Sequence, residues 1–484
     1  MNIVEQKENR TQLRKLFEQT FGAAPDTVVA LAGDGSDRRL FRLKNGSRSA
    51  VGVSNADRLE NAAFLEFSRH FRRCGLPVPE IYAETGDRSC YLEEDLGDTN
   101  LFQLLARLRK PGAPFPQEAA AVYSKAVKLL PRFQITAGKT LDYKYCHPRA
   151  EFDRQSMMWD LNYFKYYFLR LAQIPFNEQK LEDDFNRFTQ FLLGADRDYF
   201  LYRDFQSRNI MVRDAAEPWF VDYQGGRRGA LQYDMASLLF DGKADLPHEL
   251  REQLLDEYLQ AAAELIEIEP EKFRLHYYGF VHIRIMQALG AYGLRGFYEK
   301  KVHFLHSIPY AVRNLEYLLR KAKLPVELPE LRAVFERIAG SSYLRNFGAA
   351  SPGLTVRIQS FSFKKGLPPD QRGHGGGFTF DCRALPNPGR YPQYAQLTGQ
   401  DPQVKEFMER DADVKRFLEH VFPLVEQSVE NYRRRNFTDL AVSFGCTGGR
   451  HRSVFCAEAL ARRLREKYGV EIELEHAVIG GAGA

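Results

Sequence analysis

Residues 201–212, with the sequence LYRDFQSRNIMV, constrain the fold of this chain more than any other segment. Asp204 precedes Asn209 by five positions, and an apolar triplet follows Asn209 directly. Such a pattern predicts a polar loop that leads into a short buried strand. A second apolar pair, at 220–221, ends in Asp222. If the two strands are neighbours, the side-chain oxygens of Asp204, Asn209 and Asp222 converge at one edge.

Converging oxygens of this kind are suited to phosphoryl transfer. Mg²⁺ prefers one or two carboxylates together with substrate phosphates, so Asn209 and Asp222 are candidate ligands. Asp204 begins the loop and can accept a proton from an attacking hydroxyl. A surface loop with unrelated polar residues is the alternative, and a lone D-x4-N pattern would favour it. The second carboxylate, on a strand of its own, favours phosphoryl transfer.

A predicted helix, which begins with residues 233–239, follows the two predicted strands. The ensemble resembles the aminoglycoside-phosphotransferase branch of the protein-kinase-like fold. Within that branch it is most similar to the bacterial amino-sugar anomeric kinases that act on N-acetylmuramate and N-acetylglucosamine. Tyr202 stands where the family usually has a His before the loop Arg. The resemblance implies a role for each matching residue: Asp204 as the base, Asn209 and Asp222 as Mg²⁺ ligands, and Arg203 and Asp234 as supports of the loop.

The N-terminal region predicts a nucleotide site. Residues 28–43 have the pattern of a strand, a polar turn and a second strand, and residues 50–54 predict a third strand. The backbone N–H groups of a glycine-containing turn can point at phosphates, although a plain hairpin turn is the alternative. The segment also resembles the G-D-x-S-x-R-R-x-F-R pattern of the amino-sugar kinases. This resemblance implies ATP contacts from Gly33, Gly35, Ser36, Arg38 and Arg39.

One feature of protein kinases is missing from this region. Protein kinases keep a Lys on the third strand that grips the α- and β-phosphates, but residues 50–57 contain no Lys. Either Arg38 or Arg39 can take its place. In this fold the apolar strand that runs into Glu93 and Leu96 would be the hinge, where the backbone groups of these residues hydrogen-bond adenine.

Aromatic side chains are dense in residues 159–168. A core-packing helix explains them, and a surface on which a sugar stacks is the alternative. In the family that the chain resembles, C-lobe helices at this place contribute to the acceptor pocket. That position marks Asp160 as a candidate for specificity.

Composition excludes several classes of protein. The chain has 484 residues, 44% hydrophobic and 27% charged, which indicates two or three globular domains. The net charge of +5 permits phosphate-bearing ligands but does not by itself indicate nucleic acid. No apolar run approaches the length of a membrane span, and the N-terminus has no signal pattern. Six scattered cysteines without a C-x-x-C pair predict a cytoplasmic protein without disulfides or a zinc site.

The predicted architecture is an α+β, two-lobed protein-kinase-like domain followed by a smaller α/β domain. Helical periodicity dominates after the hinge. Proline, glycine and serine punctuate residues 321–354 around one short helix near 328–338, which predicts a linker. The expected parts are an N-lobe, a C-lobe, the linker itself and a C-terminal domain, at residues 1–97, 98–345, 346–354 and 355–484.

The C-terminal domain carries a second candidate site. Residues 440–444 predict a strand, 445–453 a glycine-rich turn and 454–467 a helix. Free N–H groups and the helix dipole then point at one spot, which favours an anion such as phosphate. Arginine and histidine side chains in the turn add positive charge.

Two interpretations of this turn compete. Residues 446–453 fit the phosphatase loop C-x2-G-x2-R-[ST], in which the Cys446 thiolate attacks a phosphate held by Arg452 and Asp381 is the general acid. Against this, Gly445 stands where such loops usually have His. The phosphatase interpretation therefore remains an alternative.

The other interpretation is a resemblance to the C-terminal domain of RapZ, a bacterial family of RNase adapters that sense glucosamine-6-phosphate. Four segments agree in order, within 363–368, 380–388, 397–399 and 445–453. The family's P-loop domain, its His after Pro388 and its basic RNA-holding tail are absent here. The resemblance implies a sugar-phosphate site made by Asp381, Arg383, Thr447, Gly448, Gly449, Arg450, His451, Arg452 and Ser453.

Together these observations predict an ATP- and Mg²⁺-dependent sugar kinase, acting on an amino sugar, fused to a domain that senses a sugar phosphate. Two alternatives stay open: an RNA-binding adapter with a scaffold kinase domain, and a bifunctional kinase–phosphatase that uses Cys446. Basic runs at 433–435 and 462–463 permit RNA, but a solvated helix face explains them too. No membrane partner is expected. The sequence does not give the sugar, the hydroxyl that is phosphorylated, the coupling between domains or the oligomeric state.

Overall fold

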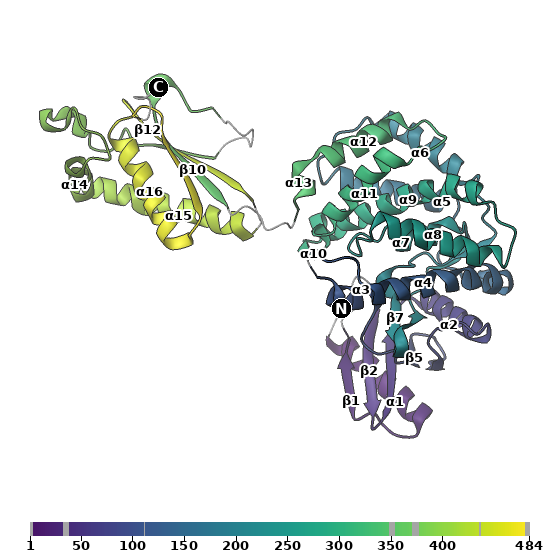
Figure 1. Ribbon diagram of the computed structural model, residues 1–484. Coiled ribbons are helices and arrows are strands. Elements are labelled where there is room, and N and C mark those ends of the chain that lie inside the picture. Colours follow the sequence, from purple (N-terminus) through teal and green to yellow (C-terminus); the bar gives the residue numbers. More distant parts are fainter. Residues whose placement is uncertain are drawn as a thin grey trace. The chain divides into compact units, whose positions relative to one another are not determined.

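The computed structural model describes residues 3–31, 38–110, 112–347, 354–369, 377–434 and 437–479. The chain forms two compact units, Met1–Phe347 and Gly348–Ala484. The first contains an antiparallel sheet followed by a helical lobe, and the second contains a parallel sheet with helices (Figure 1). The expected fold class is therefore confirmed. No helix within the described ranges is long and apolar enough to cross a membrane.

The N-lobe is a five-stranded antiparallel sheet in the order β1-β2-β3-β5-β4. Its strands are β1 (Thr27–Ala30), β2 (Arg39–Asn45), β3 (Arg48–Ser54), β4 (Ile81–Glu84) and β5 (Cys90–Glu94). Side chains alternate between the two faces of each strand. Ala50 and Leu92 therefore pack with Leu13 on helix α1 (Ile3–Phe21), whereas Val51 and Val53 pack with the C-lobe core.

Helix α2 (Arg58–Arg73) follows β3 and carries three buried phenylalanines toward the C-lobe core. Its start is fixed by Asp57, whose carboxylate accepts hydrogen bonds from the N–H groups of Leu59 and Glu60. An N-cap of this kind satisfies backbone donors that would otherwise lack partners. The cap sets where the first turn of α2 begins, and this turn presents Glu60 to the cleft.

The C-lobe is organised around α9, which is buried on most of its surface and contacts α5, α7 and α11. Two small antiparallel pairs carry the loop of the candidate site: the hairpin β7–β8, and the pair β6–β9, whose strands flank that hairpin in the chain. The strands of these pairs are β6 (Tyr199–Leu201), β7 (Ile210–Arg213), β8 (Glu217–Phe220) and β9 (Arg227–Gly229). The helices of this lobe are α3 (Leu101–Leu108), α4 (Gln117–Pro131), α5 (Arg154–Tyr163), α6 (Glu178–Leu192), α7 (Gln232–Leu239), α8 (His248–Ala263), α9 (Pro270–Tyr292), α10 (Val302–Leu305), α11 (Ile308–Lys321), α12 (Pro329–Gly340) and α13 (Ser342–Arg345).

One segment differs in structure from what its composition predicts. The stretch expected to be a linker from residue 321 onward instead contributes α12 to the first unit, where its apolar face is buried. Phe335 lies against Phe164, and Ile338 is fully buried. Proline at the start of α12 initiates the helix instead of interrupting it. Of the linker expected at 346–354, residues 348–353 lie outside the described residues.

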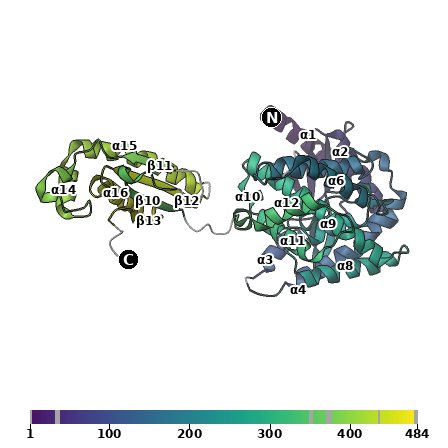
Figure 2. The same ribbon diagram turned by 90° about the horizontal axis from the view of Figure 1, so that it is seen from above.

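The C-terminal unit has a four-stranded, fully parallel sheet in the order β11-β12-β10-β13 (Figure 2). Helix α16 packs on β10, β12 and β13. Because the strands are parallel, their carboxyl ends share one edge, and the loop after β12 emerges there. The elements are β10 (Thr355–Ser362), β11 (Gly377–Asp381), α14 (Pro402–Arg410), α15 (Ala412–Arg434), β12 (Asp439–Cys446), α16 (Arg452–Tyr468) and β13 (Glu471–His476).

The π-helical segment Gly293–Tyr298, which continues α9, packs closely against the π-helical segment Phe164–Leu169, which continues α5, and this contact gives a stability prediction. A Cβ atom at Gly293 would lie 1.9 Å from the backbone oxygen of Tyr167, and backbone cannot move aside as a side-chain tip can. We expect Gly293→Ala to lower the free energy of unfolding by at least about 2 kcal/mol. Gly340→Ala is the matched control, because nothing lies within 4 Å of its added Cβ. Urea unfolding followed by circular dichroism measures both, and equal stabilities would contradict this packing.

Candidate functional site

The backbone of the loop after β6 is held by one buried carboxylate. Asp234, in the first turn of α7, accepts hydrogen bonds from the N–H groups of Tyr202 (2.8 Å) and Arg203 (3.0 Å). Gln134 donates a third bond of 2.7 Å, and Tyr258 in turn donates to Gln134. Burial raises the pKa of Asp234 to about 7, against the lowering effect of these donors. The loop is therefore anchored to α7 and, through Gln134, to the interior of the lobe.

Two residues of the site have backbone conformations that side chains rarely adopt. Arg203 has φ +80° and Asp222 has φ +69°. Such conformations persist only where the surroundings fix them, and they cluster at functional sites. Arg203 is fixed further by a two-pronged ion pair with Asp160 on α5, at 2.9 and 2.7 Å. Asp160, which the sequence marked for specificity, is thus occupied with the loop.

The three oxygen-bearing side chains predicted to meet do lie together. Nδ2 of Asn209 donates to the backbone oxygen of Asp204 (2.8 Å) and to Oδ2 of Asp222 (3.1 Å). Oδ1 of Asn209 has no donor among the described residues, so it is available as an acceptor. Gln206 approaches the Asp204 carboxylate at 3.5 Å. The loop thus brings a carboxylate, an amide oxygen and a second carboxylate to one place.

This donor set fits a hard cation in part. Within the described ranges, no three His, Cys, Asp or Glu side chains are arranged to hold a metal. Asn209 and Asp222 would therefore be the protein's own ligands, and phosphate oxygens and water would complete the shell, as Mg²⁺ requires. Arg38 now contacts Asp222 at 2.5 Å, so a cation at this carboxylate would compete with that contact.

Arg38 enters the cleft from the N-lobe, just before β2. Besides Asp222, its guanidinium lies 3.6 Å from Glu60 on α2. Burial is the largest single influence and would lower the pKa of Arg38, but Asp222, Tyr91 and Glu60 together outweigh burial and raise it. Gln224 links Asp222 to Glu60 by bonds of 2.9 and 3.4 Å. Sequence reasoning missed Glu60, because nothing in its helical surroundings distinguishes it from a solvated glutamate.

The other residues predicted to contact nucleotide are placed unevenly. Gly33, Gly35 and Ser36 lie outside the described residues. Arg39 begins β2, and Leu96 is buried just after β5. The Glu93 side chain is also buried, and burial raises its pKa to about 8. Its carboxyl oxygen Oε2 has no hydrogen-bond partner in the described part of the chain.

Two further arginines face Asp204 and were not anticipated. Burial raises the pKa of Asp204, and the positive charges of Arg284, Arg203 and Arg227 oppose that rise. Arg284 donates to the Ser237 hydroxyl, and Arg227 donates to backbone oxygens. Among the described residues, neither makes an ion pair with a carboxylate. They come from α9 and β9, so no local pattern connects them to the loop.

In the C-terminal unit, the turn after β12 wraps around the Cys446 thiol. Its sulfur accepts a hydrogen bond from the N–H of Gly449 (3.2 Å) and lies 3.2 Å from the Ser453 hydroxyl. Gly449 has φ +72°, and an added Cβ would lie 3.1 Å from the backbone of Ser362. Thr447 and Gly448 are exposed at the tip of the turn.

Positively charged side chains surround this turn. Arg452 is 5% exposed and donates to the backbone oxygens of Arg383 (2.7 Å) and Leu385 (3.0 Å). Its second terminal nitrogen reaches the Thr447 hydroxyl at 3.3 Å, and its Nε has no partner among the described residues. His451 instead contacts the backbone oxygen of Tyr394 at 3.0 Å.

Three predicted members of the second site are engaged in other contacts: two form an ion pair with each other, and the third bonds a backbone oxygen of another segment. Asp381 and Arg383 form an ion pair at 2.7 Å, which holds the pKa of Asp381 below its usual range. Asp381 is the register partner of Gly445, so it lies at the same sheet edge as the turn. Arg450 is exposed and bonds the backbone oxygen of Gln396.

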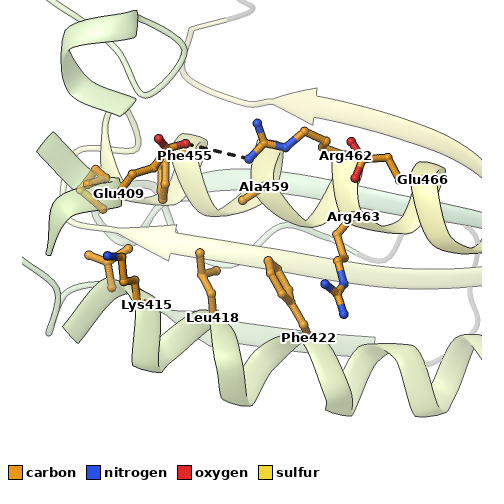
Figure 3. Close-up of a pocket in the computed structure, with 11 residues that line it drawn as sticks. Glu409, Lys415, Leu418, Phe422, Phe455, Ala459, Arg462, Arg463 and Glu466 are labelled. Carbon is orange, nitrogen blue, oxygen red and sulfur yellow. Dashed lines mark ion pairs between the residues drawn. The ribbon is translucent and has the colours of Figure 1, made fainter. Parts of the chain in front are cut away.

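Two hollows lie away from both sites. One, of about 360 Å³, runs between α15 and α16 and is lined by Leu418, Phe422 and Arg463 among others (Figure 3). The other, of about 280 Å³, lies behind the start of α7 and is lined by Gln232 and His276 among others. Neither contains a residue predicted for the sites described above.

Solved structures with low sequence identity resemble the chain in part. An apo aminoglycoside phosphotransferase APH(4)-Ia mutant covers 62% of this chain and 98% of its own, with 16% identity and a TM-score of 0.41. Choline kinase LicA from Streptococcus pneumoniae covers 65% and 100%, with 13% identity and a TM-score of 0.42. The ADP-bound APH(2'')-Ib covers 70% and 98%, with 14% identity and a TM-score of 0.41.

Curated relatives match only the C-terminal part. A nucleotide-binding protein of Azoarcus sp. (strain BH72) is 41% identical over 131 residues, 27% of this chain and 43% of that protein. One of Thermotoga neapolitana is 38% identical over 139 residues, 29% of this chain and 46% of that protein. The chain thus spans less than half the length of these relatives.

Family models cover both units. The RapZ C-terminal domain matches residues 354–480, and the phosphotransferase enzyme family matches residues 27–276, more than half of the chain. The sheet and helical lobe that carry the Asp204 loop lie within the second match. This chain therefore belongs to the phosphotransferase enzyme family, and a RapZ C-terminal domain follows its phosphotransferase domain in the sequence.

Proposed function

We propose that the first unit is a kinase that transfers phosphate from ATP to a sugar hydroxyl in the presence of Mg²⁺. The observation that carries this proposal is the meeting of Asp204, Asn209 and Asp222 on a loop anchored by Asp234. Phosphoryl transfer requires little covalent chemistry from the protein, so positioning and electrostatics dominate catalysis. A rigid loop with converging oxygens provides that positioning.

Each residue of the loop has a distinct task in this proposal. Asp204 accepts the proton of the attacking hydroxyl at a carboxylate oxygen, and its raised pKa makes it a stronger base than an exposed aspartate. Asn209 and Asp222 would hold Mg²⁺, which when bound offsets charge on the β- and γ-phosphates. Arg38, paired with Glu60, then turns from Asp222 to the phosphates and replaces the missing strand lysine.

The acceptor is proposed to be an amino sugar of the N-acetylmuramate or N-acetylglucosamine type. Its support is the resemblance of the loop and of the Arg38–Arg39 segment to the kinases that act on these sugars. Near the loop, Trp159 is 45% exposed on α5, next to the Asp160 that binds Arg203. An exposed aromatic ring of this kind offers a face on which a sugar ring can stack.

The C-terminal unit is proposed to bind an amino-sugar phosphate as a sensor. The turn after β12 offers N–H groups at the start of α16, where the helix dipole favours an anion. The buried Arg452 adds a fixed charge, and its Nε has no hydrogen-bond partner in the described part of this unit. Whether binding there alters the kinase is tested by comparing kinase kinetics with and without glucosamine-6-phosphate.

Replacing the base tests the kinase proposal. We expect Asp204→Asn to lower kcat for ATP-dependent phosphorylation of N-acetylmuramate or N-acetylglucosamine by about 10²–10⁴-fold, because the amide cannot take the proton. The measurement is phosphorylated product from a panel of amino sugars. Asp198→Asn, on an exposed residue before β6, is the matched control and should retain activity. Unchanged product formation by Asp204→Asn would reject the assigned role.

Replacing the buried arginine tests the sensor proposal. Arg452→Gln removes the charge that faces the turn, so we expect glucosamine-6-phosphate to bind at least about tenfold more weakly, the loss of one charge-assisted contact. Isothermal titration with glucosamine-6-phosphate and with glucosamine separates phosphate recognition from sugar recognition. Arg462→Gln, an exposed site on the same helix, should bind like the unaltered protein. Equal affinity for both ligands would refute an anion site here.

A further inference from the structure

Binding of a sugar phosphate in the turn after β12 requires the backbone N–H groups of the turn and Arg452. It does not require the thiol of Cys446. Cys446 ends β12, and its sulfur lies at the foot of the turn with Gly449 and Ser453 around it. A structural cysteine would be expected to pack among apolar side chains without hydrogen-bond donors. The donors around this sulfur therefore point to a chemical role.

The hydrogen bonds stabilise the ionised form of the sulfur. Burial by itself would raise the pKa of the Cys446 thiol, but the bonds from Ser453 and Gly449 outweigh burial and lower the pKa. Cys382, buried on the neighbouring strand, shows the opposite effect, because its bond with Cys456 and its burial raise its pKa well above the usual range. The two thiols lie in one domain, and only Cys446 is prepared as a thiolate, the form of cysteine that acts as a nucleophile.

Independent features of the turn point to the ligand that this thiolate would meet. Within the described ranges, the backbone N–H groups of Thr447, Gly448, Arg450 and His451 have no acceptor. Arg452 is buried, reaches the Thr447 hydroxyl, and leaves Nε without a partner. A ring of N–H donors beside a fixed guanidinium matches the oxygens of a phosphate group.

We propose that this turn is a second catalytic site, in which Cys446 hydrolyses a phosphate monoester through a phosphocysteine intermediate. The thiolate attacks phosphorus, so an S–P bond forms and the P–O bond to the alcohol breaks. The alcohol oxygen leaves with a proton. Water then attacks phosphorus, the S–P bond breaks, and the thiolate is restored as inorganic phosphate departs. The net reaction is ester plus water to alcohol plus phosphate.

The proton for the leaving alcohol comes from the Asp381 carboxyl. Asp381 is the register partner of Gly445 on the adjacent strand, so it lies at the sheet edge from which the turn emerges, and the positive charge of Arg452 acts on it. In the second step the Asp381 carboxylate takes back a proton from the attacking water. Because Arg383 holds the pKa of Asp381 low, the protonated form becomes scarcer as pH rises. Hydrolysis of alkyl phosphates should therefore fall with rising pH more steeply than hydrolysis of aryl phosphates, whose oxygen leaves without a proton.

This inference rests on the anion site proposed for the C-terminal unit and goes beyond binding. The test uses the full chain without ATP, and measures phosphate released from p-nitrophenyl phosphate and from glucosamine-6-phosphate. We expect release by the unaltered protein and its loss in Cys446→Ser, which keeps the turn but replaces the thiolate. Cys456→Ala, a buried cysteine of α16 outside the turn, is the matched control and should retain activity.

Two further measurements separate the parts of the proposal. Asp381→Asn should slow the sugar phosphate more than the aryl phosphate, because only the former needs the proton. Alkylation of Cys446 by iodoacetamide should have its midpoint below the ordinary thiol pKa of about 8.5 and should be blocked by inorganic phosphate. The alkylation midpoint should rise in Ser453→Ala, which loses one hydrogen bond to sulfur.

The outcomes distinguish this inference from the sensor on which it rests. Titration that detects glucosamine-6-phosphate binding without any phosphate release overturns the hydrolase and leaves the sensor intact. Absence of both binding and release rejects both. Phosphate release that persists in Cys446→Ser would also overturn the inference, because another group would then be the nucleophile.

Discussion

The site of the first unit depends on how one buried carboxylate is satisfied. Among the residues that the structure describes, Asp234 has no cation as a partner, and its oxygens accept from two loop N–H groups and from Gln134. Burying a carboxylate with too few hydrogen-bond donors costs folding free energy, so each of these bonds helps to keep Asp234 buried. Because Tyr258 on α8 bonds Gln134 in turn, the loop is connected through polar contacts inside an apolar core to α8 and to the π-helical segment Arg132–Ala137 that follows α4.

That anchoring explains why strained backbone persists beside it. Arg203 keeps a positive φ because its N–H is held by Asp234 and its guanidinium is held by Asp160 on another helix. The turn at Arg203 directs the next residue, Asp204, toward the cleft. Asp222 has the same kind of conformation at the end of β8, where Asn209 and Arg38 hold its two oxygens. The reactive groups are thus positioned by partners outside the loop.

Contacts between residues close together in the chain could be predicted from the sequence. Contacts between residues far apart in the chain could not. The D-x4-N spacing and the apolar triplet after it were enough to predict the meeting of Asn209 with Asp222, because a hairpin joins them. Glu60 and Arg284 approach the site from α2 and α9, and no periodicity encodes which helix faces a cleft. Proline and glycine density marked residues 321–354 as a linker around one short helix near 328–338. That helix is present as α12, and its apolar face is buried in the first unit.

The two phosphate-directed sites have opposite electrostatic character, and this difference determines what each can bind. In the first unit, Asp204 and Asp222 repel a free phosphate, so the phosphates must arrive with cations and with Arg38 to offset the carboxylates. The turn after β12 presents N–H groups and Arg452, so a phosphate monoester can bind there without a metal. The phosphorylated sugar proposed as the product of the first site is therefore a suitable ligand for the anion site proposed in the second unit.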